Sequence, residues 1–143
     1  MALVVDDHVL IDLLADNASD WLREEMSSSA IYTTGSWYYR LASAARRGSG
    51  SGTLSGRLAR LVASQREAAQ SRIERLPEWI GLLGSRLLVP VMASLDVQRT
   101  PNFLTADALA TALVVDGSLA VTVDSPLMHS GAADLGIPYR LVV

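Results

Sequence analysis

Short apolar runs alternate with longer amphipathic segments along this chain, and this alternation is its strongest constraint on the fold. Runs rich in Val, Ile and Leu indicate buried strands, at residues 2–5, 30–33, 86–91, 119–123 and 139–143. The segments between them carry apolar residues at helical spacing, the last of them ending at Gly136. Strands that alternate with helices pair in parallel through right-handed crossovers. The sequence therefore predicts an α/β fold with a parallel sheet of about five strands and helices on both faces.

Length and composition favour a single domain that spans residues 1–143. The chain is long enough to bury a core but too short for two domains. Half of its residues are hydrophobic and the mean hydropathy is +0.26, which suits a sheet buried on both faces or a subunit of an oligomer. Because there is no cysteine, disulfides and thiolate zinc sites are excluded.

The hydropathy pattern argues against a membrane protein. The longest apolar stretch, at 87–95, is about half of the roughly 20 residues that a spanning helix needs. Acidic residues at positions 6 and 7 come before any basic segment, which is unlike a signal peptide. We therefore expect a cytoplasmic protein without a membrane partner.

Aspartates stand at the expected boundaries between strands and helices. Asp6 and Asp7 follow the first strand, Asp124 follows the fourth, and Asp107 opens an expected helix at 105–116. Ligands of open α/β sheets bind at the carboxyl ends of the strands, and carboxylates gathered there favour a hard cation such as Mg²⁺. The pattern predicts a metal-dependent phosphodiester site. The structural alternative is that strand ends and helix N-caps favour Asp in any case.

The positive charge of the chain is concentrated in its middle. Residues 40–75 carry a net charge of +6 and the rest carries −9, for a total of −3. A flexible Gly/Ser loop is expected at 48–56, leading into a long basic helix at about 54–76. The candidate contacts to a nucleic-acid backbone or an acidic protein are arginines of this segment, namely Arg46, Arg47, Arg57 and Arg60. A solvated helical face is the alternative.

Four motifs of the sequence carry a resemblance to a known family. They are VVDDHVLIDLL at 4–14, TADALATA at 105–112, LAVTVD at 119–124 and GIPYR at 136–140. They resemble four parts of the PIN domain. In sequence order, these parts are the opening strand with its Asp and helix, the Asp of an alanine-rich helix, the strand with Thr-x-Asp, and the terminal turn and strand. The best-known bacterial members of that family are the ribonuclease toxins of VapBC toxin–antitoxin pairs.

This resemblance implies a fold, an activity and partners. The fold is a single PIN-like domain with strand order 3-2-1-4-5. The activity is a toxin-type ribonuclease in which Asp6, Asp107 and Asp124 bind Mg²⁺ or Mn²⁺, with Thr122 orienting a carboxylate or the attacking water. The implied partners are RNA, an antitoxin-like protein and a second copy of the chain.

The middle of the sequence departs from the family. In the segment YYRL at 38–41, Arg40 stands where the family has a glutamate, and His8 replaces a small polar residue two positions after the first Asp. A guanidinium beside the aspartates could itself satisfy them. The candidate modifiers of the site are therefore Arg40, His8 and Asp7. With Arg40 in place, no metal ion is needed to satisfy the aspartates. The aromatic residues at 37–39 would stack an unpaired base or belong to the core.

Two further functions follow as alternatives to the ribonuclease. One is a catalytically inactive PIN-like module that binds RNA or a protein partner. The other is a structural homodimer, held together by exposed apolar surface and by residues 48–75.

Overall fold

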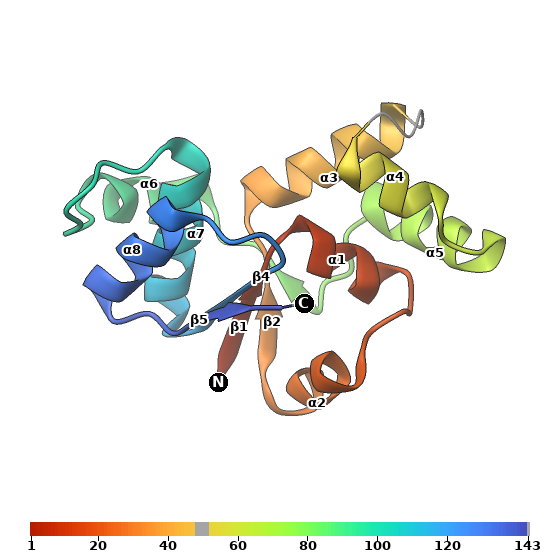
Figure 1. Cartoon of the computed structure of the whole chain (residues 1–143), viewed down its shortest axis with the longest axis horizontal. Helices are drawn as coiled ribbons and strands as arrows, with labels where there is room; N and C mark the ends of the chain where they lie inside the picture. Colours follow the sequence, from red (N-terminus) through yellow and green to blue (C-terminus); the bar gives the residue numbers. More distant parts are fainter. Residues whose placement is uncertain (48–51, 143) are drawn as a thin grey trace.

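Five short strands form one all-parallel sheet in the order β3-β2-β1-β4-β5 (Figure 1). The computed structural model describes residues 1–47 and 52–142. Its strands are β1 (Ala2–Val5), β2 (Ala30–Tyr32), β3 (Ile80–Gly81), β4 (Ser118–Val121) and β5 (Tyr139–Leu141). The predicted α/β class, parallel sheet and strand order are confirmed. Strands β1 and β4 are neighbours, so their carboxyl ends meet at the point where the strand order reverses.

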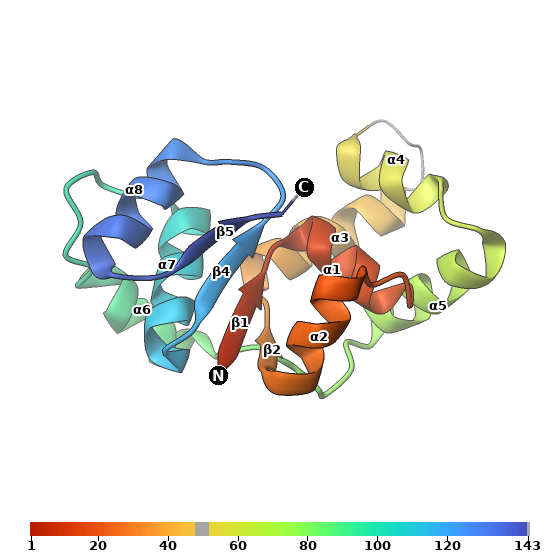
Figure 2. The same cartoon turned by 60° about the horizontal axis from the view of Figure 1, so that its bottom comes forward.

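The helices cover both faces of this sheet. They are α1 (Asp7–Leu14), α2 (Asp20–Ser28), α3 (Gly35–Arg47), α4 (Thr53–Ala59), α5 (Ala63–Glu74), α6 (Ser85–Ala93), α7 (Phe103–Val115) and α8 (Pro126–Leu135). Helices α1, α4 and α5 lie on one side of the sheet and α7 and α8 on the other (Figures 1 and 2). None of the helices in the described part of the chain has the length and apolar composition to cross a bilayer.

The central strand supplies side chains to both cores. Leu3 and Val5 belong to the apolar cluster on the α1 side, whereas Val4 belongs to the cluster on the α7 side. This alternation follows from the two-residue period of a strand. Val4 and Val5 are both fully buried, and burial of such a side chain contributes about 1.5–3 kcal/mol. Helix α3 joins the two cores, because Leu41 packs in the first and Trp37 in the second.

The predicted strand at 86–91 is wrong, because these residues lie in helix α6. The third strand is instead the two-residue segment β3, whose Ile80 pairs with Ile31. A short apolar run cannot be told from a helix by its hydrophobicity alone. In α6 only Leu88 is buried, and Pro90 lies inside the helix, where its missing N–H removes one backbone hydrogen bond.

The predicted long helix at 54–76 is also divided. Helix α4 ends at Ala59 and α5 begins at Ala63, while Leu61 between them is buried in the core on the α1 side. Part of the predicted loop at 48–56 is helical, because α4 begins directly after Gly52; positions 48–51 lie outside the described residues. Because of this break, Arg57 and Arg60 belong to the end of α4, and the arginines further along the segment belong to α5.

Arginine side chains attach these two helices to α1. The Nη2 atom of Arg57 donates to both carboxylate oxygens of Asp12, at 2.8 and 2.6 Å. The Nη1 atom of Arg72 donates to the carbonyl oxygen of Leu14 and lies 2.9 Å from Asp16 Oδ1. Burial raises the pKa of Asp12, and the charge of Arg57 opposes that rise. Arg57 therefore has a structural role, and the nucleic-acid or partner contact predicted for it stays a prediction.

Removing Arg57 should destabilise the protein. Arg57→Gln leaves the partly buried Asp12 carboxylate without its partner, so we expect the free energy of unfolding to fall by about 1–3 kcal/mol in thermal melts. The exposed Arg60 is the matched control, and Arg60→Gln should change stability by less than about 0.5 kcal/mol. Adding Asp12→Asn to Arg57→Gln should recover much of the loss. Equal effects of the two single substitutions would contradict the structural role.

Candidate functional site

Asp6 joins the ends of the two central strands. Its Oδ1 atom accepts a hydrogen bond of 2.9 Å from the backbone N–H of Val9, which makes Asp6 the N-cap of α1. Its Oδ2 atom accepts from the backbone N–H and the hydroxyl of Thr122, at 2.7 and 2.8 Å. Thr122 thus orients a carboxylate, as the resemblance implied for it. Both oxygens of Asp6 already have donors from the protein.

Asp7 is a buried carboxylate with an incomplete set of partners. It is 3% exposed, and its Oδ1 atom accepts from the backbone N–H of His8 at 3.0 Å. Arg40 Nε lies 3.4 Å from Oδ2 and forms an ion pair with it. This contact lacks hydrogen-bond geometry, so within the described chain Oδ2 accepts no hydrogen bond. Burial raises the pKa of Asp7, while the charge of Arg40 works against that rise.

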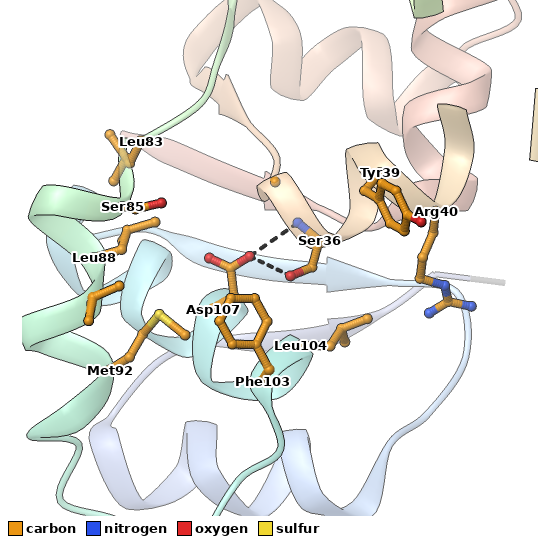
Figure 3. Close-up of a pocket in the computed structure, with 12 residues that line it drawn as sticks. Ser36, Tyr39, Arg40, Leu83, Ser85, Leu88, Met92, Phe103, Leu104 and Asp107 are labelled. Atoms are coloured by element: carbon orange, nitrogen blue, oxygen red, sulfur yellow. Dashed lines mark hydrogen bonds between the residues drawn. The ribbon is translucent and has the colours of Figure 1, made fainter. Parts of the chain in front are cut away.

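Asp107 lies on the other side of α3, in the second turn of α7. That helix begins at Phe103 with Asn102 as its N-cap, and not at Thr105 as predicted. The Oδ2 atom of Asp107 accepts from the backbone N–H and the hydroxyl of Ser36, at 3.2 and 2.7 Å (Figure 3). The sequence analysis missed Ser36, because nothing local in the sequence links it to a residue 71 positions away.

Asp124 is held at the β5 edge of the sheet. Its carboxylate accepts a hydrogen bond of 3.1 Å from the Tyr139 hydroxyl and lies 3.5 Å from His129 Nδ1. The two rings are stacked with their centroids 4.4 Å apart. The Asp124 side chain is half exposed. Strand β4 ends at Val121 and not next to Asp124, so the carboxylate is displaced from the strand end by two intervening residues.

The four aspartates line different cavities or none. Asp6 and Asp7 line one cavity of about 280 Å³. Asp107 lines a second, mostly apolar cavity of about 500 Å³ between α3, α6 and α7 (Figure 3). Asp124 lines neither of them. Across residues 1–47 and 52–142, no group of three or more His, Asp or Glu side chains is placed to hold a metal ion.

The described residues form no ready-made donor set for the metal centre that the resemblance implies. Mg²⁺ and Mn²⁺ prefer several oxygen ligands around one point. The predicted ligands Asp6, Asp107 and Asp124 are instead divided between two cavities and an exposed edge, and each accepts hydrogen bonds from the protein. Among the buried side-chain oxygen and nitrogen atoms of the described residues, only Asp7 Oδ2 has no hydrogen-bond partner. A metal site at the predicted residues stays a prediction.

Arg40 lies where the cavities of this edge meet. It lines the cavity of Asp6 and Asp7, the cavity of Asp107, and a third one that includes Arg47. Its side chain is about half exposed (52%), so its guanidinium remains accessible to a ligand. The sequence predicted a guanidinium beside the aspartates of this edge, and the ion pair that the structure shows is with Asp7.

The other predicted site residues take separate positions. His8 lines the cavity of Asp6 and Asp7. Arg46 and Arg47 are exposed in the last turn of α3, but only Arg47 lines the third cavity, since Arg46 lies at a groove beside α5. Arg60 is exposed at the end of α4.

Comparison of the sequence with models of known protein families and with curated proteins finds no match. The resemblance to PIN domains therefore rests on the four sequence motifs, and the strand order is the one that it implied.

Asp7 should make stability depend on pH. Its pKa is raised in the folded protein, so its contribution to stability is largest at low pH and is lost as the pH rises through the folded-state pKa. Above that pKa, folding must bury a charged, incompletely paired carboxylate. We expect Asp7→Asn to stabilise the protein by about 1–2 kcal/mol at pH 7 and by much less near pH 3.

Thermal melts at the two pH values check this expectation. A loss of stability at pH 7 in the Asp7→Asn variant would mean that the ion pair with Arg40 outweighs the cost of burial. Asp16→Asn is the matched control, because that carboxylate is exposed and should show no comparable gain.

Proposed function

We propose that this chain is a PIN-like protein of toxin type that binds single-stranded RNA at the carboxyl edge of its sheet without a metal ion. The observation that carries the proposal is the ion pair between Arg40 and the buried Asp7. It places a positive charge beside the aspartates, at the position where the family has a glutamate. The proposed protein binds RNA and cleaves it weakly or not at all.

The electrostatics of the edge support binding without a metal. A cation stabilises neighbouring carboxylates in their charged form, and here Arg40 supplies that charge to Asp7. The carboxylates of Asp6 and Asp107 are stabilised by hydrogen bonds from Thr122 and Ser36. Arg40 therefore offsets part of the negative charge that Mg²⁺ would otherwise neutralise, and the hydrogen bonds occupy lone pairs of Asp6 and Asp107 that a metal ion would need.

Exposed groups beside Arg40 support RNA as the ligand. Guanidinium groups bind phosphate oxygens through paired hydrogen bonds, and Arg47 lines a cavity together with Arg40. Tyr39 directly precedes Arg40 in the sequence and lines the same cavity. It is 73% exposed. Stacking of an unpaired base on such a ring contributes about 1–3 kcal/mol.

The proposal includes the partners and location expected from the sequence. The protein would act in the cytoplasm, pair with an antitoxin-like protein and form a homodimer. Val89 and Phe103, which line the cavity of Asp107, and Leu87 of α6 are exposed apolar residues. They offer surface that such a protein partner or second copy could cover.

A metal-dependent ribonuclease is the second candidate. The observation that favours it is the buried Oδ2 atom of Asp7, which has no hydrogen-bond donor among the described residues and lines the same cavity as Asp6. Buried acceptors without a donor are uncommon in native proteins. In this candidate Mg²⁺ or Mn²⁺ takes the place that Arg40 now has.

Binding and cleavage of one labelled RNA separate the two candidates. An unstructured RNA of mixed sequence is titrated with the protein in EDTA and in Mn²⁺, and its integrity is followed on gels. We expect equal binding under both conditions and no cleavage above that of an Asp6→Asn variant. Cleavage that requires Mn²⁺ and is lost in Asp6→Asn would establish the second candidate instead.

Changing Arg40 tests the electrostatic argument directly. Arg40→Glu should weaken RNA binding by about tenfold or more, since it removes a charge-assisted contact. It should also create Mn²⁺ affinity, seen as stabilisation of about 2.7 kcal/mol at 100 times the Kd. Arg99→Glu is the control, because Arg99 is exposed and undergoes the same charge reversal. Mn²⁺ stabilisation of the unmodified protein equal to that of Arg40→Glu would contradict the role given to Arg40.

A further inference from the structure

A polar cavity of about 310 Å³ lies between α3 and the start of α4. Arg40, Ser43 and Arg47 line it from α3. They are three and four residues apart, so they lie on one face of the helix. Thr53 and Ser55 line it from α4. The cavity therefore gathers two guanidinium groups and several hydroxyls from two helices.

The charge of this cavity differs from that of its two neighbours. None of the described residues that line it is acidic. The adjoining cavities contain Asp6 and Asp7 in one case and Asp107 in the other. Arg40 contacts one carboxylate, that of Asp7, at its Nε atom. Asp7 lines a different cavity and not this one. An anion is therefore favoured here and disfavoured in the neighbouring cavities.

The number of positive charges indicates which phosphate would bind best. A phosphate diester within a nucleic-acid chain carries one negative charge, whereas a terminal phosphate monoester carries about 1.5 to 2 at neutral pH. Arg47 adds a full positive charge, and Arg40, whose charge Asp7 offsets in part, adds a fraction of a second one, so together they exceed the single charge of a diester. Hydroxyl groups such as those of Ser43 and Thr53 can donate to the remaining phosphate oxygens. Tyr39 lines the same cavity and is placed to stack the base attached to that phosphate.

We propose that Arg40, Arg47, Ser43 and Thr53 bind the terminal phosphate monoester of a nucleotide chain. This inference rests on the proposed RNA binding and specifies the end of the RNA as the ligand. A free mononucleotide carries the same chemical group, and the experiment below separates it from an RNA end.

The test compares RNAs that differ only in their terminal phosphate. One oligonucleotide is prepared with a 5′-phosphate, with a 3′-phosphate and with hydroxyls at both ends, and each is titrated in EDTA by fluorescence anisotropy. We expect one phosphorylated form to bind about tenfold or more tightly than the hydroxyl form. Arg47→Gln should bring that ratio close to one, and Ser43→Ala should lower it severalfold. Arg99→Gln, the matched loss of an exposed arginine, should leave the ratio unchanged.

Adenosine 5′-monophosphate, adenosine and inorganic phosphate provide the second measurement. Thermal stabilisation by the monophosphate but not by adenosine, lost in Arg47→Gln, supports the site even if no RNA binds. Tighter binding of the monophosphate than of any RNA would identify a free nucleotide as the ligand.

The outcomes separate this inference from the proposed function. Equal binding of all three RNAs, together with no effect of the monophosphate, overturns the phosphate site and leaves RNA binding intact. Absence of RNA binding overturns the proposed function, and the mononucleotide measurement then decides the phosphate site by itself.

Discussion

The hydrogen bonds of Asp6 connect the end of β1 to helix α1 and to the segment after β4, and the carboxyl edge of the sheet depends on these connections. One oxygen caps α1, and the other binds the backbone and hydroxyl of Thr122 after β4. The carboxylate therefore fixes both the direction in which the chain leaves β1 and the distance between the two central strand ends. A helix N-cap contributes about 0.5–2 kcal/mol, and the bonds to Thr122 add a tertiary constraint. The same bonds leave Asp6 with few free lone pairs for a metal.

Helix α3 connects this edge to the remainder of the protein. Its first turn binds Asp107 through Ser36, its second turn places Arg40 beside Asp7, and its last turn presents Arg47. Trp37 and Leu41 of the same helix pack in the two separate cores. A change in the position of α3 would therefore alter three cavities together, and the position of Arg40 is set by packing on both faces of the sheet.

The arginine-rich middle of the chain has two physical roles. Arg57 and Arg72 attach α4 and α5 to α1 through carboxylates and a backbone carbonyl. Arg40 and Arg47 face a cavity that no acidic residue in the described part of the chain lines. Net charge by segment did not distinguish these roles, because it contains no information on which guanidinium groups are already paired.

The apolar runs of the sequence determined the α/β class, because they are local patterns, and the resemblance of its motifs to PIN domains implied the strand order. It also located Asp6, Asp7 and Arg40 at the carboxyl edge. The tertiary structure decided the rest: residues 86–91 are helical, the helix predicted at 54–76 is broken, and Asp107 and Asp124 have partners distant in sequence. A buried turn at Leu61 and a Ser36–Asp107 bond depend on long-range packing, which local periodicity does not encode.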